Sequence, residues 1–164
     1  MSQTNKNLMD AFAGESQANR KYLAYADKAA KEGFEQVAKL FRAAAHAETI
    51  HAHAHLRLAG KVHDTLANLE DAIAGETYEF TKMYPEMIKD AEAEGNKAAA
   101  NYMTWVNAVE EVHANLYKKA LAAKGKMDSV DYYVCTVCGY THEGPHDGPC
   151  PICKAAAKVF EKMA

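Results

Sequence analysis

The sequence has few of the residues that interrupt helices. Residues 5–123 contain one proline, Pro85, and no cysteine. No apolar run is long enough to span a bilayer, and residues 1–15 show no basic segment followed by an apolar one. A net charge of −3 gives no electrostatic reason to expect a nucleic acid or an anionic membrane. We therefore expect a cytoplasmic protein with no nucleic-acid or membrane partner.

The same stretch is rich in residues that favour helices, namely alanine, glutamate, lysine, leucine and glutamine. The helical pattern breaks at Gly33, at 60–65 and near Gly95. Four long helices with short connections are typical of an all-α four-helix bundle. We expect these helices at about 5–31, 34–59, 65–94 and 97–123.

The helical stretch contains an internal repeat of possible metal ligands. Ala-Gly-Glu ends at Glu15 and again at Glu76, and Glu-x-x-His ends at His51 and again at His113. Residues three apart share one face of a helix. One Glu from each of two helices and Glu-x-x-His from each of the other two form the two-metal site of carboxylate-bridged bundles. A single Glu-x-x-His is common on surfaces, but two copies in register predict a shared two-metal centre.

The two halves differ by one inserted residue. The Ala-Gly-Glu segments match at an offset of 61, whereas Tyr22 and Tyr84 match at an offset of 62. Glu79 lies in this stretch and has an alanine as its counterpart. We expect an extra carboxylate beside the second half of the site; the alternative is a solvated surface side chain. Pro85 removes a backbone hydrogen bond in the same helix, so we expect a kink or local widening near Tyr84.

All four cysteines lie in two Cys-x-x-Cys pairs near the C-terminus, which favours a metal site over disulfides where no export signal is seen. Four sulfurs select zinc or iron. A two-metal oxidation site needs an electron supply, which favours iron. We expect His142 and His146, between the pairs, to be exposed. We place a helical domain at 1–124, a linker at 124–129 and a metal-stabilised domain at 130–164.

Over essentially its whole length, the chain resembles rubrerythrin. The resemblance implies a ferritin-like four-helix bundle followed by a rubredoxin-like domain. It also implies two irons in the bundle and one in the four-cysteine site, with zinc possible by misloading. The matching residues are Glu15, Glu48, His51, Glu76, Glu79, Glu110 and His113, followed by Cys135 and Cys138 in Cys-x-x-Cys-Gly-Tyr and Cys150 and Cys153 in Cys-Pro-x-Cys.

The resemblance further implies an oxidoreductase, a non-haem di-iron peroxidase that reduces hydrogen peroxide to water in oxidative-stress defence. Electrons would come from NAD(P)H through a reductase or rubredoxin and enter at the cysteine-ligated iron. One alternative is a ferroxidase or iron-handling ferritin-like protein, which has no need of the cysteine module. Another is a non-catalytic, zinc-stabilised interaction protein.

Individual roles are also implied by the resemblance. One iron changes partner with its redox state, and is held by Glu79 when oxidised and by His51 when reduced. Tyr22 and Tyr84 would steady the carboxylates and the peroxide through hydrogen bonds, with core packing as the alternative. The bridging ligands would be Glu48 and Glu110, and the ligands of single irons Glu15, Glu76 and His113.

The connection between the second and third helices is short. A helix of about 26 residues is about 39 Å long, whereas the six-residue connection around Gly60 to Asp64 spans at most about 20 Å. These helices run parallel in ferritin-like bundles, and familiar rubrerythrins have a longer crossover. We therefore hypothesise a domain-swapped homodimer, with an unwound helix end as the alternative. The resemblance also implies that the cysteine-ligated iron lies near a partner's di-iron site.

Overall fold

The helices follow the breaks seen in the sequence. The structure, a computed structural model, describes residues 2–163. The third expected helix is a continuous arm of three pieces, with a π-helix between two α-helices. All expected bounds agree to within about two residues. The helical elements are α1 (Gln3–Lys31), α2 (Glu35–Leu58), α3 (Thr65–Tyr78), η1 (Glu79–Met83), α4 (Tyr84–Ala93) and α5 (Lys97–Ala122).

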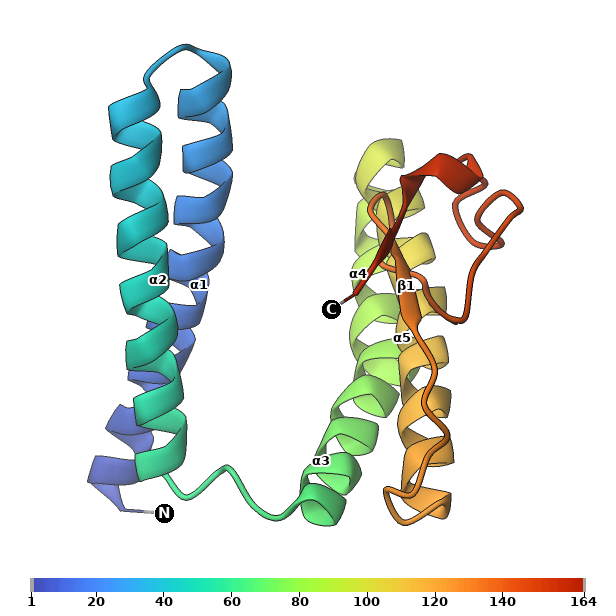
Figure 1. Ribbon diagram of the computed structural model, residues 1–164, viewed down its shortest axis with the longest axis horizontal. Helices are drawn as coiled ribbons and strands as arrows, with labels where there is room; N and C mark the ends of the chain where they lie inside the picture. Colours follow the sequence, from blue (N-terminus) through green and yellow to red (C-terminus); the bar gives the residue numbers. More distant parts are fainter. Residues whose placement is uncertain (1, 164) are drawn as a thin grey trace. The chain divides into compact units, whose positions relative to one another are not determined.

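Glycine ends the first and third arms in the same way. Gly33 and Gly95 have φ angles of 83° and 72°, a left-handed conformation that glycine adopts without strain. The following N–H groups then donate to carbonyl oxygens five residues earlier, as in the Phe34 N–H to Ala29 O hydrogen bond of 2.9 Å. Each glycine therefore reverses the chain sharply, so that neighbouring arms become antiparallel (Figure 1).

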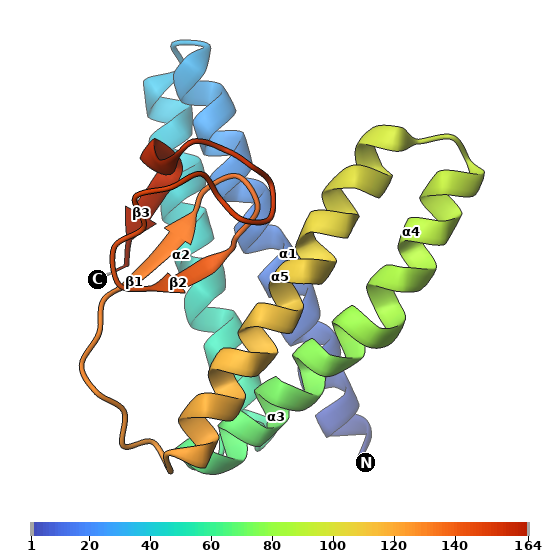
Figure 2. The ribbon, with the colours of Figure 1, turned by 90° about the vertical axis from the view of Figure 1, so that its right-hand side faces the viewer.

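The described chain divides into two compact units between His63 and Asp64. The first is the antiparallel hairpin of α1 and α2 (Figure 1). Its buried contact consists of alanines, including Ala26, Ala38 and Ala45, which allow the two helices to approach closely. In the second unit, the α3–η1–α4 arm packs along α5, and the cysteine module follows (Figure 2). Within residues 2–163, none of the helices is both long and apolar enough to cross a membrane.

The cysteine module is a small antiparallel sheet of β1 (Tyr132–Cys135), β2 (Thr141–Glu143) and β3 (Phe160–Lys162), in the order β2-β1-β3. The short 3-10 helix η2 (Ala157–Val159) precedes β3. A mostly helical chain with a small metal-binding module near the C-terminus is the expected fold.

The module packs against α5 of its own chain. Val109 of α5 is 1% exposed and forms one apolar cluster with Cys135, Cys138 and Cys150. Trp105, one turn earlier on α5, packs against the same cluster. The apolar face of α5 itself therefore buries the cysteines.

The expectation that His142 and His146 are exposed is wrong. Both side chains are half-buried, and their ring centroids lie 4.9 Å apart. His146 also lies 4.5 Å from the ring of Phe160, and His142 lies 6.2 Å from that of Tyr140. The two imidazoles are therefore part of the aromatic packing of the module, where their flat rings cover apolar surface.

Candidate metal centres

The first candidate half-site lies on the α1–α2 hairpin. Glu15 of α1 faces Glu48 and His51, which are one turn apart on α2. Nδ1 of His51 lies 2.9 Å from Oε2 of Glu48 and 4.0 Å from Oε1 of Glu15. Next to this group, Nδ2 of Asn19 donates a 2.7 Å hydrogen bond to the carbonyl oxygen of Ala45. This cross-helix bond fixes α1 against α2 at the level of the half-site.

The second candidate half-site repeats this geometry on α3 and α5. Glu76 faces Glu110 and His113, and Nδ1 of His113 lies 2.8 Å from Oε2 of Glu110 and 3.9 Å from Oε1 of Glu76. In both half-sites, one ligand atom from each residue lies within 4.8 Å of the others. The internal repeat in the sequence is therefore a repeat in three dimensions.

The electrostatics of both half-sites favour a cation between the carboxylates. A hydrogen bond between the Glu15 and Glu48 side chains raises the pKa of Glu15 and lowers that of Glu48. In the second half-site, burial and then the charge of Glu110 raise the pKa of Glu76. A proton or a metal ion relieves this repulsion, and two carboxylates with one imidazole suit iron. The donor sets therefore fit the expected irons.

Glu79 lies beside the second half-site on the π-helix. The inserted residue is absorbed in η1, which confirms the local widening expected near Tyr84. Glu79 is half-buried rather than fully solvated. Burial, followed by the charge of Glu76, raises the pKa of its carboxyl, whereas the charge of His113 lowers it. Glu79 is therefore close enough to interact electrostatically with two members of the half-site.

Tyr84 lies near the carboxylates of the second half-site. Burial and then the charges of Glu110 and Glu79 raise the pKa of its phenol. Tyr22, the other expected tyrosine, packs in the first unit against Phe41 and Tyr25, with ring centroids 6.1 and 6.3 Å away. The surroundings of the two tyrosines therefore differ, because Tyr84 lies near carboxylates and Tyr22 belongs to an aromatic cluster.

Tyr117 is a further tyrosine near the second half-site that we did not expect there. It lies one turn after His113 on α5, and burial followed by the charges of Glu76 and Glu110 raises the pKa of its phenol. The signal was present in the sequence, because residues four apart share one face of a helix.

The four cysteines converge as a tetrahedral metal site requires. Sγ of Cys135 lies 3.7 Å from Sγ of Cys153, and Sγ of Cys138 lies 3.6 Å from Sγ of Cys150. A metal with bonds of about 2.3 Å to four tetrahedral sulfurs places those sulfurs about 3.8 Å apart. These distances are far longer than a disulfide bond of about 2.05 Å. The module therefore fits one four-thiolate iron or zinc ion.

Backbone N–H groups support the thiolates unevenly. Burial acts to raise the pKa of Cys135, but N–H groups of Cys138 and Val137 lower it overall. Burial raises the pKa of Cys138 and Cys153 above that of an ordinary thiol. A metal ion must therefore displace protons when it binds, because the thiolate is the ligand.

Comparison with known proteins gives the same division of the chain. The family model described as rubrerythrin matches residues 6–121, and that of the rubrerythrin, rubredoxin-like domain matches residues 133–161. Nigerythrin of Nitratidesulfovibrio vulgaris is 38% identical over 174 residues, which cover 96% of this chain and 85% of that protein. Rubrerythrin-1 of Clostridium acetobutylicum is 34% identical over 184 residues, which cover 98% and 94%.

Solved structures of nigerythrin are also similar to this chain. One, in a partially reduced state, superposes with a TM-score of 0.60 at 34% identity and covers 99% of this chain and 88% of that one. Another is of the fully reduced, all-ferrous state, with the same TM-score, identity and coverage.

Proposed function

Because the chain belongs to the rubrerythrin family, we propose that it is a di-iron peroxidase that reduces hydrogen peroxide to water. The ferritin-like and rubredoxin-like fold is confirmed, and members of the family are iron-dependent oxidoreductases. Hydrogen peroxide takes up two electrons and two protons and gives two molecules of water. Two irons held by the glutamates and histidines of the half-sites would supply the electrons. An iron held by the four cysteines would receive replacements from a rubredoxin or an NAD(P)H-dependent reductase. The cytoplasm is the proposed location.

The proposed ligands follow the two half-sites. Glu48 and Glu110 would be ligands of both irons, because each is the less exposed of the two glutamates in its half-site. Glu15 and Glu76 each hold one iron. The phenols of Tyr84 and Tyr117 lie where they can hold ligating carboxylates in place, whereas the packing of Tyr22 supports its structural alternative.

The half-buried Glu79 on the π-helix is the observation that carries the peroxidase proposal. Each half-site provides two glutamates and one histidine, and Glu79 is an additional carboxylate beside the second half-site. Glu79 would hold one iron in its oxidised state, and His51 would hold the same iron in its reduced state.

Stopped-flow oxidation of the fully reduced, iron-loaded chain tests this role. With hydrogen peroxide, we expect the Glu79→Ala variant to react about 10- to 100-fold more slowly than the wild type, since ligand-orienting and ligating groups contribute this much. Glu86→Ala is the matched control, because Glu86 is an exposed carboxylate on the same arm. Equal rates for Glu79→Ala and Glu86→Ala would remove Glu79 from the mechanism.

The proposed active form is a domain-swapped homodimer. Helix α2 has 24 residues and is about 36 Å long, but its connection to α3 spans only residues 59–64, which reach at most about 20 Å. The side chain of Asp64 caps α3 by accepting from the N–H of Ala67 at 2.9 Å, and the N–H of Lys61 closes the end of α2 by donating to the carbonyl oxygen of Leu56. These closed ends argue against an unwound helix that would lengthen the connection.

The exposed apolar side chains of the first unit support the same assembly. Leu40, Ile50 and Leu58 are 67%, 55% and 72% exposed on a hairpin that has only alanines at its buried contact. A two-helix hairpin cannot bury such residues by itself, and a partner's helices would cover them. In the proposed dimer, each site combines the first half-site of one chain with the second half-site of the other.

A further inference from the structure

Strand β2 of the cysteine module lies along α5 with one face directed at the second half-site. Alternate residues of a strand share a face, so Thr141 and Glu143 both face α5, and Gly139, two residues before Thr141, also lies against this helix. A side-chain Cβ at Gly139 would lie 3.8 Å from Val109. Glu143 forms a 2.5 Å ion pair with Lys119, two to three turns further along the helix. Between the contacts at Gly139 and Glu143, Thr141 forms a hydrogen bond with His113.

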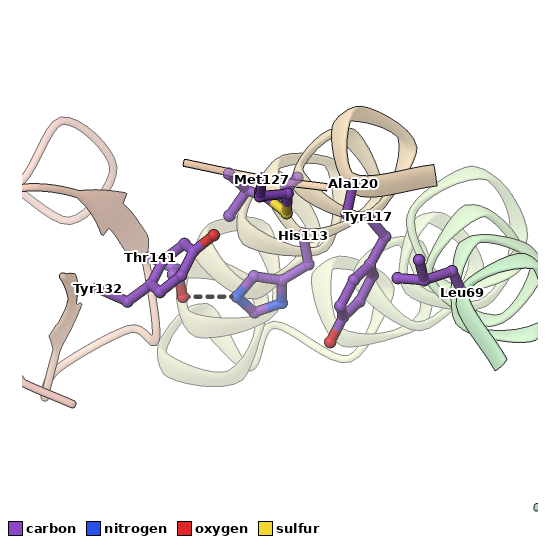
Figure 3. A pocket seen from close by; sticks show the side chains of 8 residues that line it. Leu69, His113, Tyr117, Ala120, Met127, Tyr132 and Thr141 are labelled. Carbon is purple, nitrogen blue, oxygen red and sulfur yellow. Dashed lines mark hydrogen bonds between the residues drawn. The ribbon is translucent and has the colours of Figure 1, made fainter. Parts of the chain in front are cut away.

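The hydrogen bonds of Thr141 define the proton on His113. The Thr141 hydroxyl donates to the carbonyl oxygen of Gly139 at 3.2 Å. Its oxygen therefore presents a lone pair to Nε2 of His113, which lies 3.0 Å away (Figure 3). Nε2 must then carry the ring proton, because one of the two atoms has to donate. Nδ1 is left directed at the carboxylates of Glu110 and Glu76, where a metal ligand is needed.

The opposite half-site has a more exposed imidazole. The side chain of His113 is 26% exposed and that of His51 is 53% exposed, although their distances to the neighbouring glutamates agree closely. The module covers His113 and bonds to its second nitrogen.

We propose that Thr141 is a positioning residue, through which the cysteine module of the same chain orients His113 and provides a path for electrons to the second half-site. The proposal rests on the proposed function above. A hydroxyl that accepts from Nε2–H fixes the tautomer and the ring plane of a metal-ligating imidazole. Thr141 follows Cys138 by three residues, so the covalent path from the thiolate ligand to the hydrogen bond is short.

The electron balance of this path is simple. A ferrous iron held by the four cysteines would give up one electron and become ferric, and that electron would reduce one ferric ion held by the half-sites to the ferrous state. The external donor, a rubredoxin or an NAD(P)H-dependent reductase, then reduces the cysteine-ligated iron again. Thr141 and His113 gain and lose no atoms, since the hydrogen bond between them persists throughout.

A cavity lies beside this hydrogen bond. It has a volume of about 360 Å³ and is lined mainly by apolar side chains of α5, α3 and the linker, including Leu116, Met127 and Leu69. In Figure 3, the imidazole of His113 lies between Thr141 and Tyr117, with Met127 nearby. Removal of the Thr141 hydroxyl should therefore leave Nε2 of His113 without its hydrogen bond to the module.

The contact is tested first without peroxidase chemistry. The full chain is labelled with ¹⁵N-histidine and loaded with zinc, which is diamagnetic, and its imidazole N–H signals are recorded. We expect one signal protected from exchange with water in the wild type and in Thr141→Ser, and its loss in Thr141→Val. Thr136→Val is the matched control, because the Thr136 hydroxyl donates to Val159 O elsewhere in the module. A signal that survives in Thr141→Val, or is lost equally in Thr136→Val, would overturn the proposal.

The electron path is tested with the iron-loaded, fully reduced chain. After mixing with hydrogen peroxide, the return of the visible ferric-thiolate absorption reports the electron that leaves the cysteine site. We expect this step to slow about tenfold in Thr141→Val and not in Thr141→Ser or Thr136→Val. An unchanged rate in Thr141→Val would refute the path. If the wild type itself does not react with peroxide, the proposed function fails, while the zinc-loaded spectra still decide the role of Thr141. Thr141→Ala replaces Thr141→Val if the latter does not fold.

Discussion

Mixing two inactive variants tests whether each active site is shared between chains. The first variant loses the first half-site through Glu48→Gln and His51→Gln, and the second loses the other through Glu110→Gln and His113→Gln. In a domain-swapped heterodimer, one site receives both altered half-sites and the other receives both intact ones. Each heterodimer therefore has one working site of two, although neither variant has any alone.

The expected recovery of activity follows from the number of intact sites in each dimer. Random assortment of equal amounts makes about half of the dimers heterodimers, so the mixture should recover about a quarter of the wild-type activity. Heterodimers purified through two different affinity tags should recover about half. The assay is peroxide consumption with a reductase and rubredoxin, and native mass spectrometry verifies a dimer of two 18.0 kDa chains. Heterodimers that form and remain inactive would refute the shared site.

Three further predictions concern stability and metal binding. Val109→Ala should lower the stability of the metal-loaded chain by about 2 kcal/mol and its Tm by about 5 °C, because two buried methyl groups are lost between α5 and the module. Val130→Ala is the control, because the Val130 side chain is 42% exposed. An equal loss of stability in the two variants would contradict the prediction. The raised pKa of Glu76 means that its ionisation destabilises the metal-free fold as the pH rises above the usual carboxyl range. Glu76→Gln should therefore raise the Tm of chelator-treated protein at about pH 7 and leave it unchanged below about pH 4. A Tm below that of the wild type at neutral pH would contradict this prediction. The raised pKa of Cys138 and Cys153 predicts that metal binding at the cysteine site releases protons, so that the metal affinity falls as the pH falls. A chelator-competition titration at several pH values measures this affinity. A metal affinity that is independent of pH would contradict the prediction.

The half-sites were predictable because helix geometry is local. Glu48 and His51 are three residues apart, so the backbone alone directs both to one face. The local widening near Tyr84 was predicted from Pro85, which removes a backbone hydrogen bond from the helix. Family membership, inferred from these motifs, is confirmed by the comparisons.

The contacts of the cysteine module were not predictable in the same way. Thr141 and His113 are 28 residues apart, and their contact depends on how β2 packs against α5. The burial of His146 likewise depends on Phe160, and that of His142 on Tyr140 and His146. Spacing in the sequence contains no signal for such contacts, because packing of a separate module decides them. Tyr117 differs, since its four-residue spacing from His113 was a usable signal.

The central claim is that this chain reduces peroxide, and the oxidation rate of its all-ferrous form tests that claim most directly. The iron-loaded protein is reduced fully and mixed in a stopped-flow instrument with hydrogen peroxide or with oxygen at equal concentrations. The account predicts that peroxide oxidises the iron centres faster than oxygen does. Faster oxidation by oxygen would contradict it and support a ferroxidase.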